Sequence, residues 1–174
     1  ATPLEDDELI EKPIYYEPFV AYLPITNPHF GKSEISPSDL YSNDLLLLKD
    51  GNCFRNSIEN LCFDCNEYKG RFDLKSGNFE TLINLVDKGL GMTFLPYLHT
   101  LRLNESQKKM LHEFKNPKPS REISVVYHKN EVKIHIINEI KDLLKDLTKI
   151  KLQFNDVNII SPIKNREAAR LLEN

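Results

Sequence analysis

All three cysteines of this 174-residue chain, Cys53, Cys62 and Cys65, fall within one short stretch of sequence. Thiols gathered in this way are typical of redox or metal-binding sites. An odd number of cysteines also argues against a fully disulfide-bonded secreted scaffold. Thiol chemistry is therefore the first function that the sequence suggests.

Cys53 has the surroundings of a reactive thiol. Asn52 is a natural N-cap, which would make Cys53 the first residue of a helix, with Arg55 within one turn of it. The unpaired N–H groups at that helix end and the guanidinium both favour the thiolate over the thiol. The thiolate is the form that attacks peroxides to give a sulfenic acid. The pattern therefore predicts a peroxide-reactive cysteine at position 53.

Cys62 follows Cys53 by nine residues, a spacing that puts the two side chains on opposite sides of a regular helix. Their separation along the helix axis would be about 13 Å, whereas a disulfide requires Cα atoms within about 7 Å. If these two thiols were joined, the helix between them would have to unwind, so their oxidation would change the conformation of this segment.

Other interpretations of the same cysteines stay open. Cys62 and Cys65 lie on an apolar helical stripe and could simply fill space in the core. They also form a CxxC motif, but without the preceding strand and proline environment of a thioredoxin-like site. A zinc site would need a fourth ligand, and the histidines are dispersed without metal-ligand spacing. With no glycine-rich phosphate loop either, we expect neither a metal nor a cofactor.

The elements that must position these thiols are expected to alternate between strands and helices. Apolar residues recur with helical spacing after Asn52, and a further helix is expected between a cap at Asn78 and Gly89. This alternation indicates an α/β fold with a largely parallel sheet. The expected strands cover residues 14–23, 44–49, 71–75, 90–95 and 122–127, and the other expected helices cover residues 107–111, 132–150 and 165–172.

The charge pattern argues against direct nucleic-acid binding by this chain. The formal net charge is -3, the pI is about 6.0 and the charged residues are scattered, so the basic footprint of a DNA-binding surface is absent. No apolar run approaches the roughly 20 residues that span a bilayer, and no signal segment opens the chain. We therefore expect a cytoplasmic protein without membrane contact, and Ala1 in place of an initiator methionine suggests a fragment.

The segment around Cys53 resembles the redox segment of the peroxide-sensing LysR-type transcription regulators. That resemblance rests on Asp50-Gly51, a cysteine, an arginine two residues later and a second cysteine at the ninth position. It extends over most of the chain, where the matches are generic to LysR-type proteins. Those matches are Thr2-Pro3-Leu4, Tyr16-Glu17-Pro18-Phe19, Phe79-Glu80-Thr81-Leu82, residues 89–96, Arg121-Glu122-Ile123 and Val125-Val126-Tyr127.

The resemblance implies an α/β regulatory domain of two lobes, in the style of type 2 periplasmic binding proteins. The second lobe would be largely complete and the first lobe partial. The family's winged helix-turn-helix domain has no counterpart here, so promoter DNA would be bound only through parts that this chain lacks. The implied boundaries are residues 1–19 for the partial first lobe and crossover, 20–120 for the second lobe with the redox switch, 121–150 for the return crossover and a first-lobe helix, and 151–174 for a C-terminal tail.

The function implied by the resemblance is hydrogen-peroxide sensing in an activator of oxidative-stress genes, and not turnover catalysis. By motif match, Cys53 is the peroxidatic cysteine and Cys62 the resolving cysteine, and their disulfide is the switch. The implied partners are hydrogen peroxide, further copies of the chain in a homodimer or homotetramer, promoter DNA and RNA polymerase. The residues expected to shape the pocket and the switch segment are Gly51, Asn52, Arg55 and Arg121.

Two departures from the family pattern concern the thiols directly. Asn52 stands where a histidine often precedes the reactive cysteine, and Cys65 is an additional thiol that could compete with Cys62. The alternative functions are a LysR-type effector domain that binds a small metabolite, with incidental cysteines, and a thiol peroxidase, which only Cys53 supports.

Overall fold

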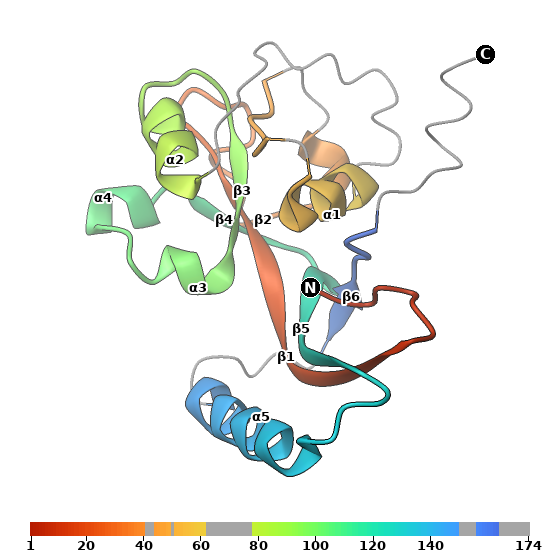
Figure 1. The fold of residues 1–174 in the computed structure, drawn as a ribbon. Helices are drawn as coiled ribbons and strands as arrows, with labels where there is room; N and C mark the ends of the chain where they lie inside the picture. Colours follow the sequence, from red (N-terminus) through yellow and green to blue (C-terminus); the bar gives the residue numbers. More distant parts are fainter. Residues whose placement is uncertain (41–43, 50, 62–77, 150–155, 164–174) are drawn as a thin grey trace, which may run out of the picture.

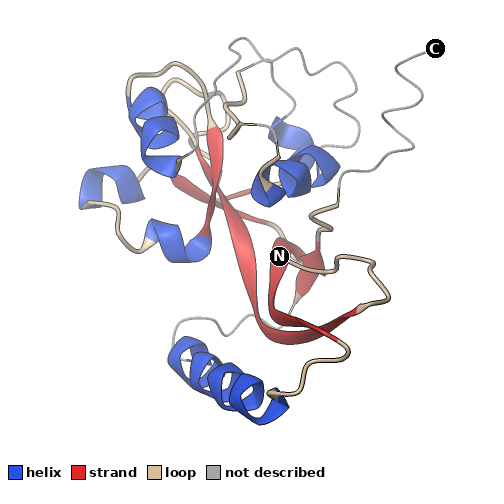
Figure 2. Cartoon of the chain, viewed as in Figure 1, coloured by secondary structure: helices blue, strands red, loops and turns tan. Residues whose placement is uncertain are grey.

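The computed structural model describes residues 1–40, 44–49, 51–61, 78–149 and 156–163, which form a mixed α/β fold around a curled sheet (Figures 1 and 2). The strands are β1 (Leu9–Tyr22), β2 (Glu34–Ile35), β3 (Thr93–Pro96), β4 (Leu111–Phe114), β5 (Lys118–His128) and β6 (Val157–Ile159). The helices are η1 (Pro37–Leu40, a 3-10 turn), α1 (Cys53–Leu61), α2 (Phe79–Asp87), α3 (Tyr97–Thr100), α4 (Glu105–Lys108) and α5 (Ile134–Lys149).

Strand β1 is the centre of the sheet, whose order is β2-β4-β1-β5-β6, with β3 also paired to β1. Its first part pairs with β5 from Leu9 to Pro18, and its last part pairs with β3 and β4. These three pairings are antiparallel, and the parallel pairings are β2 with β4 and β5 with β6. The expectation of a largely parallel sheet was therefore wrong. Strand β5 brings the chain back alongside β1, so these two strands run in opposite directions.

The core lies around the second part of β1, where α1 and α2 also pack (Figure 1). Every residue from Glu17 to Leu23 is buried, whereas the earlier residues of the strand, Leu9 to Tyr16, are half-buried or exposed. The buried Tyr22 hydroxyl donates a 2.5 Å hydrogen bond to Asp87 at the end of α2. Burial, together with this bond, raises the pKa of Tyr22 above its ordinary value, which keeps the phenol protonated. This bond ties α2 to the central strand.

Both caps predicted for α2 are confirmed. The Asn78 side chain accepts a 2.9 Å hydrogen bond from the Thr81 N–H. At the other end, Gly89 has a φ of +73°, and the N–H groups of Gly89 and Leu90 donate to the carbonyls of Val86 and Leu85. This is a Schellman motif, which a residue without Cβ adopts at low cost.

In the stretch of residues 44–49, expected as a strand, the four leucines at 45–48 are buried, but the stretch forms a single parallel bridge, between Leu45 and Met92. The Leu46 N–H donates to the Met92 carbonyl at 2.8 Å, and the Met92 N–H donates to Asp44 at 2.9 Å. Gly91 permits this approach, because a Cβ added there would lie 2.2 Å from the Asp44 carbonyl oxygen. The leucine run was therefore identified correctly as buried and wrongly as a full strand.

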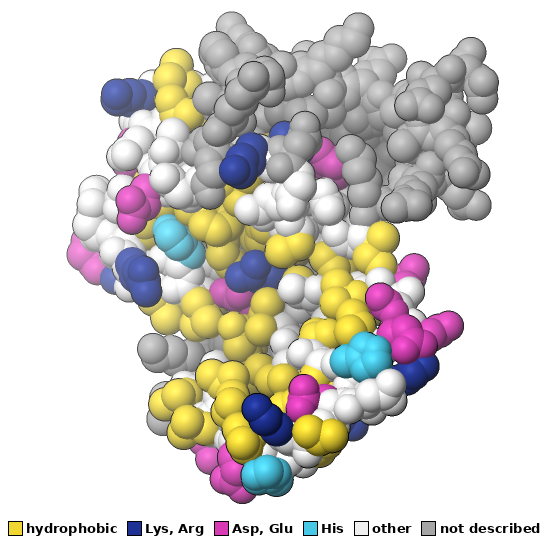
Figure 3. All heavy atoms as spheres, viewed as in Figure 1, with side chains coloured by type: hydrophobic (Ala, Val, Ile, Leu, Met, Phe, Trp, Pro, Cys, Tyr) yellow, Lys and Arg dark blue, Asp and Glu magenta, His cyan; other side chains and the backbone are white. Residues whose placement is uncertain are grey.

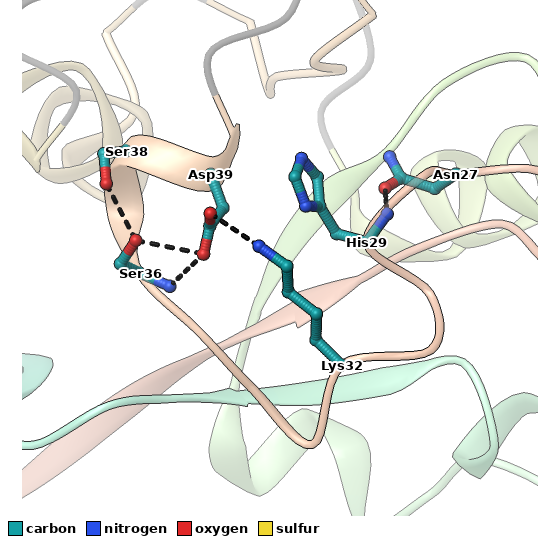
Figure 4. A network of polar contacts seen from close by, with 6 residues as sticks. All are labelled: Asn27, His29, Lys32, Ser36, Ser38 and Asp39. Carbon is teal, nitrogen blue, oxygen red and sulfur yellow. Dashed lines mark hydrogen bonds and ion pairs between the residues drawn. The ribbon is translucent and has the colours of Figure 1, made fainter.

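A polar network closes the loop between β1 and η1 (Figure 4). The Asp39 carboxylate accepts hydrogen bonds from the Ser36 N–H and hydroxyl and forms a 2.8 Å ion pair with Lys32. Lys32, and then the Ser36 N–H, hold the pKa of Asp39 well below its usual range. Asn27 accepts from the His29 N–H at 2.9 Å in the same loop.

Helix α5 confirms the prediction for residues 132–150 and lies at the opposite end of β1 from α1 and α2 (Figure 1). Its outer side leaves Ile136, Ile140, Leu143 and Leu147 exposed, and Figure 3 shows apolar side chains gathered in this region. Among the described residues, no helix combines the length and apolar character needed to cross a membrane.

The remaining expected elements differ in outcome. The strand at residues 90–95 begins later, as β3, and the strand at 122–127 is part of the longer β5. The helix expected at 107–111 is α4, which begins two residues earlier and ends three residues earlier, and Leu111 already belongs to β4. The strand at 71–75, the helix at 165–172 and the extension of the cysteine helix past Leu61 lie outside the described residues.

Candidate functional site

The site is built around the first turn of α1. Gly51, with a φ of +80°, turns the chain, and the Asn52 side chain accepts a 2.9 Å hydrogen bond from the Phe54 N–H. The Asn56 N–H closes the turn on the Asn52 carbonyl at 3.1 Å. Asn52 is thus the N-cap and Cys53 the first helical residue, as predicted. The Cys53 side chain is exposed, so its thiol is accessible at the positive end of the helix.

Arg55 anchors α1 to the segment that precedes it. Its Nε donates to Glu59 at 2.8 Å, one turn further along the helix, and its Nη1 donates to the Leu48 carbonyl at 2.9 Å. Neither of these contacts involves Cys53. The guanidinium therefore shares its charge with Glu59, and its position explains how residues 44–48 and α1 are held together.

Arg121 reaches α1 from strand β5. Its Nε and Nη2 donate to Oε2 of Glu17 at 2.9 and 2.8 Å, and the other oxygen of Glu17 accepts from the Leu98 N–H at 2.8 Å. Glu17 is only 1% exposed, so its charge depends on these three donors. The Arg121 guanidinium also lies 5.4 Å from the centre of the Phe54 ring, within the range of a cation–π contact. Arg121 thereby connects β1, β5 and α3 to the residue next to Cys53.

Phe54 joins three further elements to the first turn of α1. It is buried, and its ring meets those of Phe19 on β1 and Phe79 on α2 edge-on, at centroid distances of 5.2 and 5.0 Å. The Phe79 ring contacts His99 of α3 at 5.1 Å. Edge-to-face pairs of this kind add specific geometry to the apolar area that they bury. The position of Cys53 is thus fixed through its neighbour.

Burial and charge near this cluster keep two titratable side chains neutral. Burial, and then the carboxylate of Glu17, raise the pKa of Tyr15, while Arg121 acts in the opposite direction. Burial, and then the charge of Arg102, lower the pKa of His99, opposed by Glu80 and Glu17. The Glu17–Arg121 pair therefore stands among neutral neighbours.

The structure brings together Gly51, Asn52, Cys53 and Arg55 at one helix end, with Arg121 behind it across the Phe54 ring. Cys62 and Cys65 lie outside the described residues. Sequence reasoning missed Glu17 and Phe54 as parts of the site. A charged residue inside a strongly apolar strand was the signal for Glu17, because such a charge is seldom buried without a partner. Within the described ranges, no three His, Cys, Asp or Glu side chains gather where they could hold a metal ion.

Comparisons with known proteins agree with this architecture. Residues 1–149 match the family model of the LysR substrate binding domain. The chain is 33% identical over 129 residues to a hydrogen peroxide-inducible genes activator of Haemophilus influenzae, and 31% identical over 123 residues to one of Pectobacterium carotovorum. These alignments cover 73% and 71% of this chain but 42% and 40% of the relatives, so the chain spans less than half of their length.

Solved structures give the same result. The crystal structure of OxyR from Porphyromonas gingivalis superposes with a TM-score of 0.79 at 25% identity, covering 92% of this chain and 74% of that one. The two-lobed α/β fold of the type 2 periplasmic-binding-protein style is therefore the fold of this chain. The chain belongs to the LysR substrate-binding domain family.

Proposed function

We propose that this chain is the regulatory domain of a cytoplasmic, peroxide-responsive transcription activator, and that Cys53 is its sensing residue. The observation that carries the proposal is the exposed Cys53 thiol at the first position of a helix capped by Asn52. Unpaired backbone N–H groups at a helix end attract anionic groups, and the thiolate is the form of cysteine that attacks peroxides. The names of the relatives, which are hydrogen peroxide-inducible activators, agree with this chemistry.

The reaction consumes one peroxide per pair of thiols. The Cys53 thiolate attacks one oxygen of hydrogen peroxide, an S–O bond forms as the O–O bond breaks, and the departing hydroxide takes up a proton to become water. A second thiolate, which we assign to Cys62, then attacks the sulfur of the sulfenic acid. The S–O bond breaks, a second water leaves, and the two electrons that reduced the peroxide have come from two thiols. Cys65 is the competing candidate for the second thiol.

Helix α1 makes this disulfide a conformational switch. Its nine residues from Cys53 to Leu61 hold the two ends about 12 Å apart at 1.5 Å per residue, and Cys62 follows directly. A disulfide needs Cα atoms within about 7 Å, so α1 has to unwind before the bond can form. Unwinding moves Phe54, and with it the contacts to Phe19, Phe79 and Arg121.

The consequence for the rest of the protein follows from β1 and β5. Glu17 and Arg121 sit on these two strands, which connect the part of the sheet near α1 with the part near α5. We assign residues 20–120 mainly to the second lobe, and the flanking residues 1–19 and 121–150 to the first lobe and its crossovers. A change at Phe54 then reaches the junction of the lobes. In a longer protein that also contains a DNA-binding part, that change would alter the contacts with promoter DNA, RNA polymerase and the further subunits of a homodimer or homotetramer.

Mass spectrometry of the reduced protein after stoichiometric peroxide treatment tests the proposal. We expect a disulfide-linked peptide pair that contains Cys53 and Cys62, and we expect no such product in Cys53→Ser. Cys62→Ser and Cys65→Ser, compared side by side, identify the resolving thiol. Absence of any Cys53-linked disulfide would overturn the proposal and favour a metabolite-binding effector domain, and sustained peroxide consumption with a thiol reductant would favour a thiol peroxidase.

A further inference from the structure

Helix α1 carries two asparagines one turn apart, Asn56 and Asn60, whose side chains donate hydrogen bonds to a segment remote in sequence. We call this set of hydrogen bonds the grip. The amide of Asn56 donates to the Pro162 carbonyl at 3.0 Å. The amide of Asn60 donates to two carbonyls, those of Ser161 at 2.8 Å and Ile163 at 2.7 Å. Three consecutive carbonyls are therefore held by two side chains of the helix that carries Cys53.

The gripped segment is itself fixed to the sheet. β6 pairs in parallel with the start of β5, from Lys118 with Val157 to Ser120 with Ile159. The Ile160 N–H donates to the Ser120 carbonyl at 2.8 Å, and the Ile160 side chain packs against the core. Residues 157–163 thus run from β5 to α1, and we call them the strap. Its Pro162, which carries the middle one of the three carbonyls, is buried.

The grip requires a helix. Side chains at positions i and i+4 lie on one helical face, with Cβ atoms about 5–6 Å apart. In an extended chain the same two residues would be about 13 Å apart, too far to reach consecutive carbonyls. Unwinding α1 would therefore break the grip on the strap.

We propose that Asn56, Asn60 and residues 161–163 form a clamp that stabilises the helical form of α1 and is released when Cys53 is oxidised. The proposal rests on the proposed function and adds to it a means of regulation. The clamp sets how readily the thiols react, and its release frees the strap between β5 and α1 from the helix. Asn56 and Asn60 are then positioning residues, which act on Cys53 through the helix.

Hydrogen exchange of the reduced protein tests the contact without any redox chemistry. Asn60→Asp keeps the shape of the side chain but replaces its N–H donors with a carboxylate, and Asn60→Ala removes the donors without adding charge. We expect the backbone amides of Ile159, Ile160, Ser161 and Ile163 to exchange about tenfold faster in both variants. Asn84→Asp, at an exposed position of α2, is the matched control and should leave them unchanged. Equal exchange in the Asn60 variants and the unmodified protein would overturn the clamp.

A second measurement tests the coupling to Cys53. The protein is equilibrated in a buffer of reduced and oxidised thiol, and mass spectrometry measures the fraction of Cys53 in the disulfide. For Asn60→Asp, the equilibrium constant for disulfide formation should be about tenfold larger than for the unmodified protein. For Asn84→Asp it should be unchanged. Peroxide should also speed exchange of residues 159–163 in the unmodified protein. A Cys53 disulfide that forms without either change would refute the coupling and leave the proposed function intact. If no Cys53 disulfide forms, the proposed function and the coupling both fail, while exchange in the reduced protein still decides whether the clamp exists.

Discussion

Helices α1 and α2 have equal lengths, each has an asparagine N-cap, and each contributes a phenylalanine to one aromatic contact, yet they are held in different ways. Helix α2 buries Leu82, Ile83 and Val86 and is closed by its own Schellman motif. Helix α1 buries Phe54, Ile58 and a serine. Polar and cationic contacts from residues outside the helix also hold it, among them those of the Leu48 carbonyl, Arg121 and residues 161–163.

The difference teaches how one fold can contain a fixed helix and a convertible one. Apolar burial against the core and caps at both ends stabilise the helical form of α2. The helical form of α1 depends in addition on side chains and carbonyls from distant segments, and unwinding would break these contacts together. A helix of this kind suits a site whose chemistry requires it to open.

The largest expected effect tests whether Phe54 is the main apolar anchor of α1. Phe54→Ala should lower the free energy of unfolding by about 3–5 kcal/mol, because it empties a buried position between Phe19 and Phe79. Phe79→Ala, at a half-buried position of α2, should cost only about 2 kcal/mol. Urea denaturation followed by circular dichroism measures both. Equal losses for the two variants would mean that α1 and α2 do not differ in this respect.

The Glu17–Arg121 pair should matter more than an exposed ion pair of similar length. Glu17→Gln leaves Arg121 partly buried without its carboxylate and should cost about 2–3 kcal/mol in free energy of unfolding. Glu113→Gln breaks the exposed pair with Lys118 and should cost less than about 0.5 kcal/mol. The same denaturation series provides the comparison. A Glu17→Gln protein as stable as Glu113→Gln would show that β1 and β5 do not depend on this charge.

The two N-caps, Asn52 and Asn78, should contribute equally to the stability of the protein but differ in their effect on the reactivity of Cys53. Asn52→Ala and Asn78→Ala should each cost about 1 kcal/mol, since each removes one hydrogen bond to a helical N–H. Only Asn52→Ala should slow the alkylation of Cys53 by iodoacetamide, by several fold, because Cys53 directly follows this cap and its position depends on that helix end. An equal alkylation rate in both variants would show that the reactivity of Cys53 does not depend on its N-cap.

The smallest effect concerns His99 and pH. Its lowered pKa means that the folded protein holds the ring neutral, while the unfolded chain takes up a proton near the ordinary value of 6.5. Stability is therefore full above about pH 6.5 and decreases as the pH falls below it, until His99 is protonated in the folded state as well. Thermal unfolding between pH 5 and 8 should show this slope, and His99→Gln should flatten it. A slope that is the same in His99→Gln would assign the pH dependence to other groups.

The parts of this site that depend on near neighbours could be predicted from the sequence. Asn52, Asn78 and Gly89 act on groups within five residues, and all three were identified from the sequence pattern. The place of Cys53 as the first helical residue followed from the same local reasoning. Caps and turns are encoded locally, so a single sequence displays them.

The parts that depend on distant neighbours could not be predicted. Glu17 and Arg121 are 104 residues apart, and Asn60 and Ser161 are 101 apart. Periodicity indicates which face of an element is apolar, but it carries no information on which remote element meets that face. For the same reason the leucines at positions 45–48 were recognised as buried, while their reduction to one bridge with Met92 was not foreseen.

The central position of β1 also has a consequence for how the chain acquires its fold during synthesis. The strand leaves the ribosome before its partners β3, β4 and β5, which come much later in the chain. Its last residues can pair once β3 and β4 have been made, whereas Leu9 has to wait for His128. Since domains assemble as their segments emerge, the nascent chain should close its sheet beside α1 and α2 first and complete the long crossover last. Until then, the first half of β1 is an unpaired strand that depends on the rest of the chain arriving in time.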